Sequence, residues 1–307
     1  MRILVLGAGV IGSVYAGKLL AAGHDVVLLA RGSRLVDLQA HGLVLEDAES
    51  GNRSVVPVSS VGEPAAGDVF DLVLVPVRAE QLTSTLPILT GMNDDSPVLF
   101  FGNTANRQAE LRATLGERAL FGFPAAGGTR DGQVVRYVLI SQQKTMLGEP
   151  DGTTSPRVRH LQSALEEAGF PTRISADIED WLLAHAAFVV PIAFALYRVG
   201  GDPVRLAADP ASMRLMVLAT RQAFTALRAT GNDEIPTNLR ILYRLPTRAV
   251  TAYWRRVLEG PRGELWFGGH SRAAPEEMRD LADQLQETLR RTGRRTPDLD
   301  RLLLARH

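Results

Sequence analysis

Residues 3–34 read ILVLGAGVIGSVYAGKLLAAGHDVVLLARGSR, and this stretch decides the fold. A short apolar run leads into a glycine-rich turn. A helical pattern follows and ends at Gly23, and a second apolar run comes next. The glycines of the turn have the spacing G-x-G-x-x-G. This order of strand, glycine turn, helix and strand is typical of a dinucleotide-binding βαβ unit.

Each glycine of the turn has a separate task in such a unit. Gly7 permits the tight turn, Gly9 lets a pyrophosphate approach the backbone, and Gly12 lets helix and strand pack closely. The pyrophosphate would then lie on the free N–H groups at the positive end of the helix, which begins near Val10 and Ile11. These five residues are therefore our expected cofactor contacts.

The residue after the second strand selects the dinucleotide. NAD and FAD sites usually have an Asp or Glu there for the ribose 2′-hydroxyl, whereas this chain has Arg31, followed by Ser33 and Arg34. Two guanidiniums and a hydroxyl suit a 2′-phosphate, because the planar fork of arginine matches phosphate oxygens. The sequence therefore predicts NADP as the cofactor, although both arginines could also be solvated loop residues.

Beyond this unit, the first half continues to alternate apolar runs with helical segments. The runs LVLVPV, VLFF, ALFGF, VVRYVLI and KTMLG contain little polar alternation, which is typical of strands buried on both faces. We expect an α/β fold, a Rossmann-type doubly wound sheet over residues 1–174. After Ser175 the pattern becomes helical, so residues 175–307 are expected to form an all-helical domain for substrate binding or dimerisation.

The segment DWLLAHAAFVVPI, residues 180–192, lies at the start of the helical half. It is apolar enough to suggest a membrane span, but His185 and Pro191 interrupt it and no basic residues flank it closely. A buried helix is the favoured interpretation. Pro191 is expected to bend that helix, which would open a cleft.

Composition excludes several classes of protein. The chain has 307 residues, 45% of them hydrophobic, with 34 basic and 34 acidic side chains, so no positive surplus favours nucleic acid or an anionic membrane. It has no cysteine, which fits a cytoplasmic location, and its scattered histidines predict no metal site.

Several of these features together resemble the ketopantoate reductase (2-dehydropantoate 2-reductase) family. They are the glycine motif with Arg31, the strand ending in VPVRAEQ, the FGN after the next strand, and the helical second half. The resemblance implies reduction of a 2-oxo acid by NADPH, between a Rossmann domain and a helical domain like that of 6-phosphogluconate dehydrogenases. It also implies site roles for Arg78, where the family usually has lysine, and for Asn103.

The resemblance also implies a catalytic lysine in the first long helix of the second domain, and this chain lacks it. Leu183 occupies that position, and the only lysines in the chain are Lys18 and Lys144. Ketone reduction needs a proton donor with a pKa that can be tuned towards neutrality. His185 is the candidate, with a water molecule or a purely structural histidine as the alternatives.

The segment GELWFGGH has Glu264 where the family carries an acid that reaches cofactor and substrate, and His270 follows it. Thr251 is the nearest hydroxyl to the position of the family's substrate-binding serine. We therefore expect His185, Glu264 and Asn103 to act in catalysis. The expected function of the protein is the NADPH-dependent reduction of a small carbonyl compound.

Three other functions remain open. A catalytically silent NADP sensor would keep the nucleotide site without the lysine. A dehydrogenase of the 3-hydroxy acid or 6-phosphogluconate type is a second option, and a flavoprotein is the third. The expected partner is a small-molecule substrate, and a homodimer is compatible with the helical half.

Overall fold

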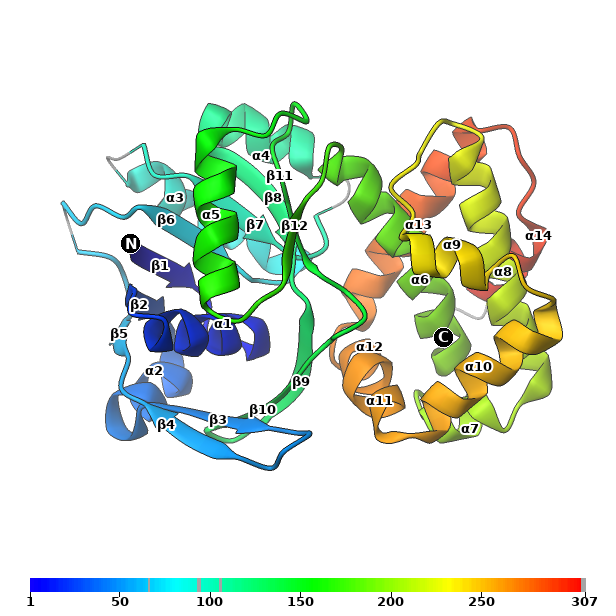
Figure 1. Ribbon diagram of the computed structural model, residues 1–307, viewed down its shortest axis with the longest axis horizontal. Helices are drawn as coiled ribbons and strands as arrows, with labels where there is room; N and C mark the ends of the chain where they lie inside the picture. The colour runs from blue at the N-terminus through cyan, green and yellow to red at the C-terminus, as the bar shows by residue number, and fades with distance from the viewer. Residues whose placement is uncertain (66, 93–94, 105–106, 305–307) are drawn as a thin grey trace. The chain divides into compact units, whose positions relative to one another are not determined.

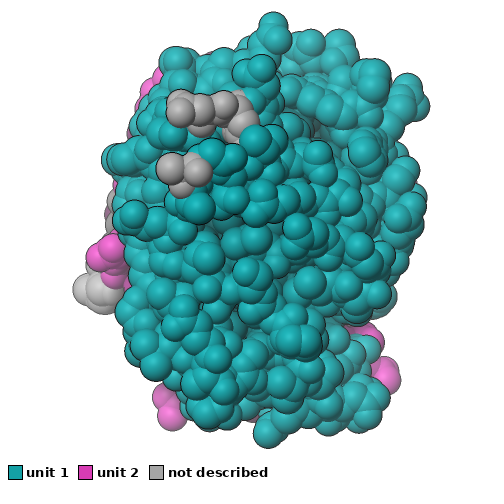
Figure 2. Space-filling view, turned by 90° about the vertical axis from the view of Figure 1, so that its left-hand side faces the viewer, with its two compact units in different colours: residues 1–178 teal, residues 179–307 magenta. Residues whose placement is uncertain are grey.

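The computed structural model describes residues 1–65, 67–92, 95–104 and 107–304. The chain divides into two compact units, residues 1–178 and residues 179–307 (Figures 1 and 2). The sequence pattern places this boundary four residues earlier, after residue 174. Residues 175–178 stay with the first unit because the Ser175 N–H donates to the Leu147 carbonyl at 2.7 Å and Ile178 packs on Gly148.

The N-terminal unit is built on an eight-stranded sheet with the order β12-β11-β8-β7-β6-β1-β2-β5. Neighbouring strands are parallel except for β8 and β11. The strands are β1 (Arg2–Leu6), β2 (Asp25–Leu29), β5 (Ser59–Val61), β6 (Leu72–Val75), β7 (Val98–Phe101), β8 (Ala119–Phe123), β11 (Thr145–Gly148) and β12 (Thr172–Ile174). The chain goes from β1 to β2 and β5 on one side and returns to β6 on the other side of β1, so the strand order reverses at β1. Doubly wound folds bind ligands in the crevice at such a switch point.

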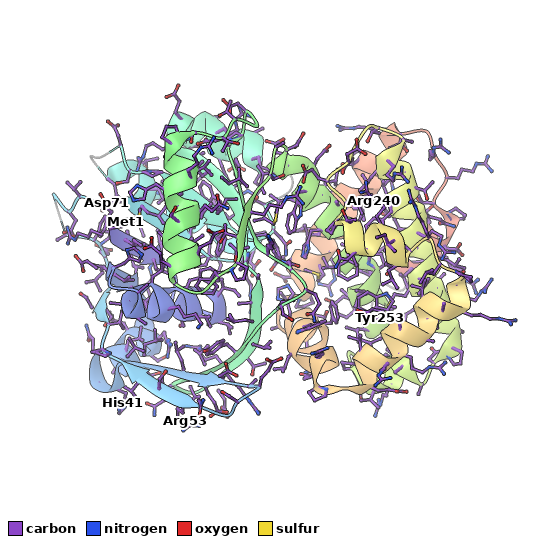
Figure 3. All side chains as sticks on the ribbon, viewed as in Figure 1. Met1, His41, Arg53, Asp71, Arg240 and Tyr253 are labelled. Carbon is purple, nitrogen blue, oxygen red and sulfur yellow. The ribbon has the colours of Figure 1, made fainter. Side chains whose placement is uncertain are left out.

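A second sheet of four strands has the order β4-β3-β10-β9 (Figure 1). Its strands are β3 (Leu43–Asp47), β4 (Arg53–Val56), β9 (Ala126–Asp131) and β10 (Val134–Leu139). Of these, the sequence pattern predicted only β10, and it also missed β5. The side chains of β4 are mostly exposed, and Arg53, labelled in Figure 3, pairs with Glu46 of β3 at 2.6 Å. Such strands are defined by their pairing partners, which local apolar patterns do not reveal.

Helices of the N-terminal unit surround the main sheet. They are α1 (Val10–Ala21), α2 (Gly32–His41), α3 (Leu82–Gly91), α4 (Gln108–Leu115) and α5 (Pro156–Glu167), with 3₁₀ turns η1 (Ala79–Gln81) and η2 (Gly116–Arg118). Tyr15 of α1 is fully buried and stacks on Phe170 with 3.8 Å between ring centroids. Its hydroxyl lies 2.7 Å from Thr145 Oγ1, and burial raises the pKa of this phenol above its usual value. The expected parallel sheet with helices on it is confirmed.

The C-terminal unit is helical throughout its described residues, which confirms the expected helical half. Its elements are α6 (Ile178–Tyr197), α7 (Pro203–Ala207), α8 (Pro210–Arg228), α9 (Thr237–Leu242), α10 (Thr247–Glu259), α11 (Pro261–Gly263), the π-helical turn η3 (Glu264–Gly268), α12 (Gly269–Ala273), α13 (Pro275–Arg291) and α14 (Pro297–Leu303). Asp209 caps α8, since its Oδ1 accepts the Ala211 and Ser212 N–H groups. Thr296 occupies the N-cap of α14, but its side chain makes no capping bond.

Helix α6 contains the apolar segment and runs unbroken through Pro191. By length and composition it could cross a membrane, with a mean hydropathy of 1.6, yet 72% of that window is buried inside the protein. One side of it packs in an aromatic cluster, where Phe188 contacts Trp254 and Phe267 at centroid distances of 5.4 and 6.2 Å. This burial agrees with the interpretation of the segment as a core helix.

Candidate active site

The glycine loop between β1 and α1 has the geometry that a pyrophosphate needs. Gly7 has a φ of +127°, and a Cβ at Gly12 would lie 1.9 Å from the Gly7 carbonyl oxygen, so the turn and the close packing both require glycine. A Cβ at Gly9 would meet nothing within 4 Å, which leaves open space above the loop. Val10 and Ile11 begin a helix whose first turn holds no acidic residue. Its free N–H groups can therefore donate hydrogen bonds to an anion.

The segment after β2 carries the predicted 2′-phosphate residues. Arg31 and Ser33 are exposed, and Arg31 is the N-cap residue of α2. In the described part of the chain, neither side chain makes a hydrogen bond or an ion pair. Both can therefore turn towards a ligand, and no carboxylate occupies the position after β2 that would repel a 2′-phosphate.

Arg34, which was predicted to bind the 2′-phosphate together with Arg31, differs from these two residues because its side chain is turned into the protein. It is 7% exposed, and its Nε, Nη1 and Nη2 donate at 3.2 Å to the Ala8 carbonyl, the Gln133 carbonyl and Ser13 Oγ. Burial lowers the pKa of this guanidinium, and Arg130 contributes further. Arg34 thus connects α2 to the glycine loop and to α1 through these hydrogen bonds, a role that the sequence did not reveal.

Segments after β6 and β7 converge on the same loop. A Cβ at Gly7 would lie 2.9 Å from Val77 Cγ1, and one at Gly12 would lie 3.0 Å from Pro76 Cγ. Arg78 follows directly, begins the turn η1, is 45% exposed and has Glu80 at 3.9 Å. The structure therefore brings the residue expected to bind substrate or nicotinamide next to the glycine motif.

Asn103 lies in the loop after β7, where its side chain is partly buried. The preceding Gly102 approaches the Val77 carbonyl, since a Cβ there would lie 3.7 Å away. Its loop therefore also reaches the segment after β6. Gly7, Gly9, Arg78 and Asn103 thus follow parallel strands of the main sheet and lie at its carboxyl edge.

In the C-terminal unit, His185 stacks on Trp181 with ring centroids 5.3 Å apart and planes 11° apart. Part of its side chain remains exposed, but burial lowers the pKa of His185 from 6.5 to about 3, with a smaller contribution from His270. The ring is therefore neutral at neutral pH. A pKa this low is unfavourable for proton donation at neutral pH, and the catalytic role of His185 stays a prediction.

Glu264 opens the π-helical turn η3, a rare local structure that often occurs at functional sites. Its carboxylate forms a two-pronged ion pair with Arg272, in which Oε1 contacts Nη2 and Oε2 lies 3.1 Å from Nη1. Arg272 also donates to the Gly201 carbonyl at 2.8 Å, and the hydrogen bond to Glu264 raises the pKa of Arg272. Both side chains remain nearly half exposed, so Glu264 is oriented while its carboxylate stays accessible.

The sequence did not identify Arg272 as the partner of Glu264. Residues eight apart on a regular α-helix differ by about 80° in direction, which gives no reason to pair them. The π-helical turn changes that relation. Thr251, the expected hydroxyl, lies on α10 in a pocket with Pro210 and Arg214 of α8.

Comparison with known proteins finds similarities chiefly in the N-terminal unit. Residues 3–152 match the family model described as "Ketopantoate reductase PanE/ApbA". A 2-dehydropantoate 2-reductase of Mesorhizobium japonicum is 29% identical over 209 residues, which cover 59% of this chain. The matched segment spans 63% of that relative, so less than two thirds of its length is compared.

Solved structures share the fold of nearly the whole chain. A 2-dehydropantoate 2-reductase from Geobacter metallireducens superposes with a TM-score of 0.82 at 17% identity, over 99% of this chain and 98% of that one. The ternary structure of D-mandelate dehydrogenase with NADH and anilino(oxo)acetate gives 0.76 at 17% identity, over 99% and 96%. At such identities the likeness establishes the fold alone.

Proposed function

We propose that the protein is an NADPH-dependent oxidoreductase of the ketopantoate reductase family, whose model residues 3–152 match. Its substrate is a small carbonyl compound, a 2-oxo acid, which the cofactor reduces by hydride transfer. The observation that supports this most strongly is the open space at Gly9 beside an exposed Arg31 and Ser33. The relatives named 2-dehydropantoate 2-reductase and the D-mandelate dehydrogenase neighbour support the substrate class.

The preference for NADPH depends on Arg31. A guanidinium at the adenosine ribose attracts a 2′-phosphate, and no acidic side chain is there to accept the 2′-hydroxyl of NADH. The D-mandelate dehydrogenase neighbour was solved with NADH, so the preference requires a direct measurement on this chain.

Calorimetric titration with the two cofactors tests it. We expect wild-type protein to bind NADPH more tightly than NADH, and Arg31→Gln to weaken NADPH binding about tenfold or more while NADH binding changes little. Arg53→Gln, a change at an exposed arginine of the same unit, is the control and should leave both affinities unchanged. Equal affinities of wild-type protein for the two cofactors would refute the NADP assignment.

The roles of the other site residues follow from their chemistry. Arg78 and Asn103, at the carboxyl edge of the sheet, position the substrate and the nicotinamide. Glu264, held by Arg272, orients the substrate hydroxyl. With a pKa near 3, the His185 ring is not protonated at neutral pH and has no extra proton to donate, which favours the other donor considered, a water molecule.

Substitution of His185 separates the two proton donors. If a water molecule supplies the proton, His185→Ala should lower turnover by no more than a few-fold. His185→Phe, which keeps a ring that can pack on Trp181, is the control for the loss of packing. A much larger loss of turnover in both variants, with NADPH affinity intact, would assign the proton transfer to the imidazole.

A catalytically silent NADP sensor is the second candidate function. The C-terminal unit contains no lysine in its sequence, and Glu264 already has a cationic partner. Both observations favour a site that binds without turnover. NADPH consumption with a panel of 2-oxo acids separates the two candidates, since binding without consumption of any of them favours the sensor.

A further inference from the structure

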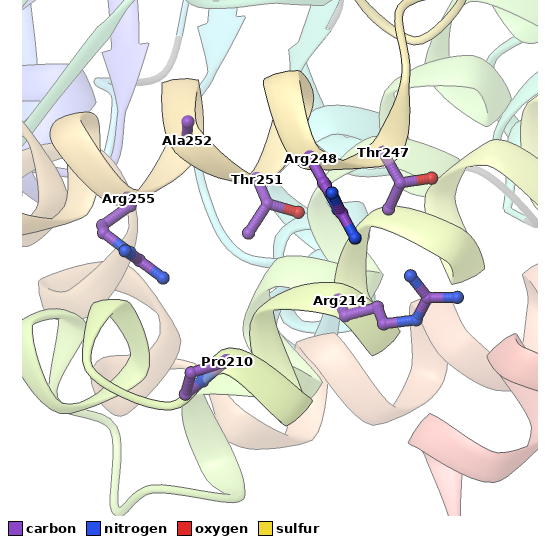
Figure 4. Close-up of a pocket in the computed structure, with 7 residues that line it drawn as sticks. All are labelled: Pro210, Arg214, Thr247, Arg248, Thr251, Ala252 and Arg255. Carbon is purple, nitrogen blue, oxygen red and sulfur yellow. The ribbon is translucent and has the colours of Figure 1, made fainter.

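A pocket of about 300 Å³ lies between helices α8 and α10 of the C-terminal unit (Figure 4). Arg248, Thr251 and Arg255 line it from α10, and Pro210 and Arg214 line it from α8. The spacing of three and four residues puts each set on one face of its helix. No acidic side chain lines the pocket, so its charge is positive.

The charge of this pocket is not neutralised by the protein. In the described part of the chain, none of Arg214, Arg248 and Arg255 has an ion-pair partner, whereas many other arginines of the chain do. The chain as a whole has equal numbers of basic and acidic side chains, so three unpaired guanidiniums around one pocket are a local excess. An anion in the pocket would interact favourably with all three charges.

Hydrogen-bond donors in the pocket are also oriented. Arg221 donates from Nη1 to Thr247 Oγ1 at 2.9 Å and from Nε to the Tyr243 carbonyl at 3.1 Å, which holds the start of α10 in place. Because Thr247 Oγ1 accepts this bond, its own proton remains for another acceptor. The first turn of α10 has no acidic residue and no side-chain cap, so its N–H groups add to the positive field.

From this arrangement we propose that the pocket binds a phosphorylated small molecule, at a site separate from the glycine loop. Three guanidiniums and a hydroxyl match a tetrahedral group with two or more negative charges better than a planar carboxylate, for which one arginine suffices. The volume exceeds that of a phosphate ion, which leaves room for an organic group. Figure 4 shows Arg248 and Arg255 reaching from α10 towards α8.

Calorimetric titration of the full chain with pyrophosphate, inorganic phosphate and succinate tests the proposal. We expect pyrophosphate to bind more tightly than phosphate, succinate to bind least, and all binding to weaken as NaCl is raised. In the triple variant Arg214→Gln, Arg248→Gln, Arg255→Gln, pyrophosphate affinity should fall by about tenfold or more. Arg256→Gln, an exposed neighbour on α10 outside the pocket, should retain wild-type affinity.

Two results would overturn the proposal: no pyrophosphate binding by wild-type protein at low salt, or equal affinities of the wild type and the triple variant. The second result would place the anion elsewhere, for example at the glycine loop. NADPH titration of the same variants keeps this test apart from the proposed function. We expect the triple variant to bind NADPH as the wild type does, and a protein that binds no NADPH could still bind pyrophosphate in this pocket.

Discussion

The two units present their polar groups in different ways. In the N-terminal unit the expected ligand contacts are backbone N–H groups of the glycine loop and exposed side chains such as Arg31, with space above Gly9. In the C-terminal unit the expected catalytic residues already have intramolecular neighbours: Glu264 pairs with Arg272, and His185 stacks on Trp181. A backbone motif determines its own geometry and the kind of ligand group that its N–H donors can bind, whereas the chemistry of a single side chain depends on the residues that pack around it.

The glycine loop allows the sharpest test of the backbone contribution. Gly12→Ala puts a Cβ 1.9 Å from the Gly7 carbonyl oxygen, so we expect the free energy of unfolding to fall by about 3 kcal/mol or more in a denaturant titration. Gly9→Ala is the matched control. Its Cβ meets no protein atom, so stability should stay within about 0.5 kcal/mol of wild type while NADPH affinity drops. The reverse order of stabilities would contradict the assigned roles.

Arg34 tests whether a buried side chain can support such a loop. Arg34→Gln removes donors to two carbonyls and to Ser13 Oγ, and we expect a loss of about 1–3 kcal/mol in the free energy of unfolding. Because the guanidinium braces the loop, affinities for NADPH and NADH should fall by similar factors. A selective loss of NADPH binding, as expected for Arg31→Gln, would instead return Arg34 to direct contact with the 2′-phosphate.

His185 gives an effect of a different kind, a dependence of stability on pH. Its pKa is about 3 in the folded protein and 6.5 in the unfolded chain, so the unfolded state binds the proton between these values. Its contribution is complete above pH 6.5 and declines as the pH falls towards 3, by at most about 1.4 kcal/mol per pH unit. Unfolding titrations of His185→Phe at several pH values should show a flatter acid limb.

The exposed His160 on α5 provides the control for this measurement. His160→Gln should leave the acid limb of the stability profile unchanged. An identical pH dependence in wild type and His185→Phe would mean that the imidazole is better solvated than its position on Trp181 indicates.

The local sequence was sufficient to predict the structure where a motif specifies its own backbone conformation. The apolar runs predicted most strands of the main sheet, and G-x-G-x-x-G predicted a turn, a free helix terminus and a close approach at Gly12. Strands β3, β4, β5 and β9 were missed. β3 and β5 pair with strands distant in the sequence, whereas β4 and β9 form hairpins with β3 and β10 and have few buried apolar side chains. β4 in particular lies with its side chains mostly in solvent.

The sequence by itself determined the βαβ unit, the helical second half, the absence of a lysine from that half and the arginine after β2. These follow from residue identity and short-range periodicity. Only the tertiary structure decided that Arg34 faces inward, that His185 is neutral, that Glu264 has Arg272 as its partner and that three arginines surround one pocket. Burial, charge pairing and pKa depend on neighbours that folding brings together, and no short stretch of sequence contains them.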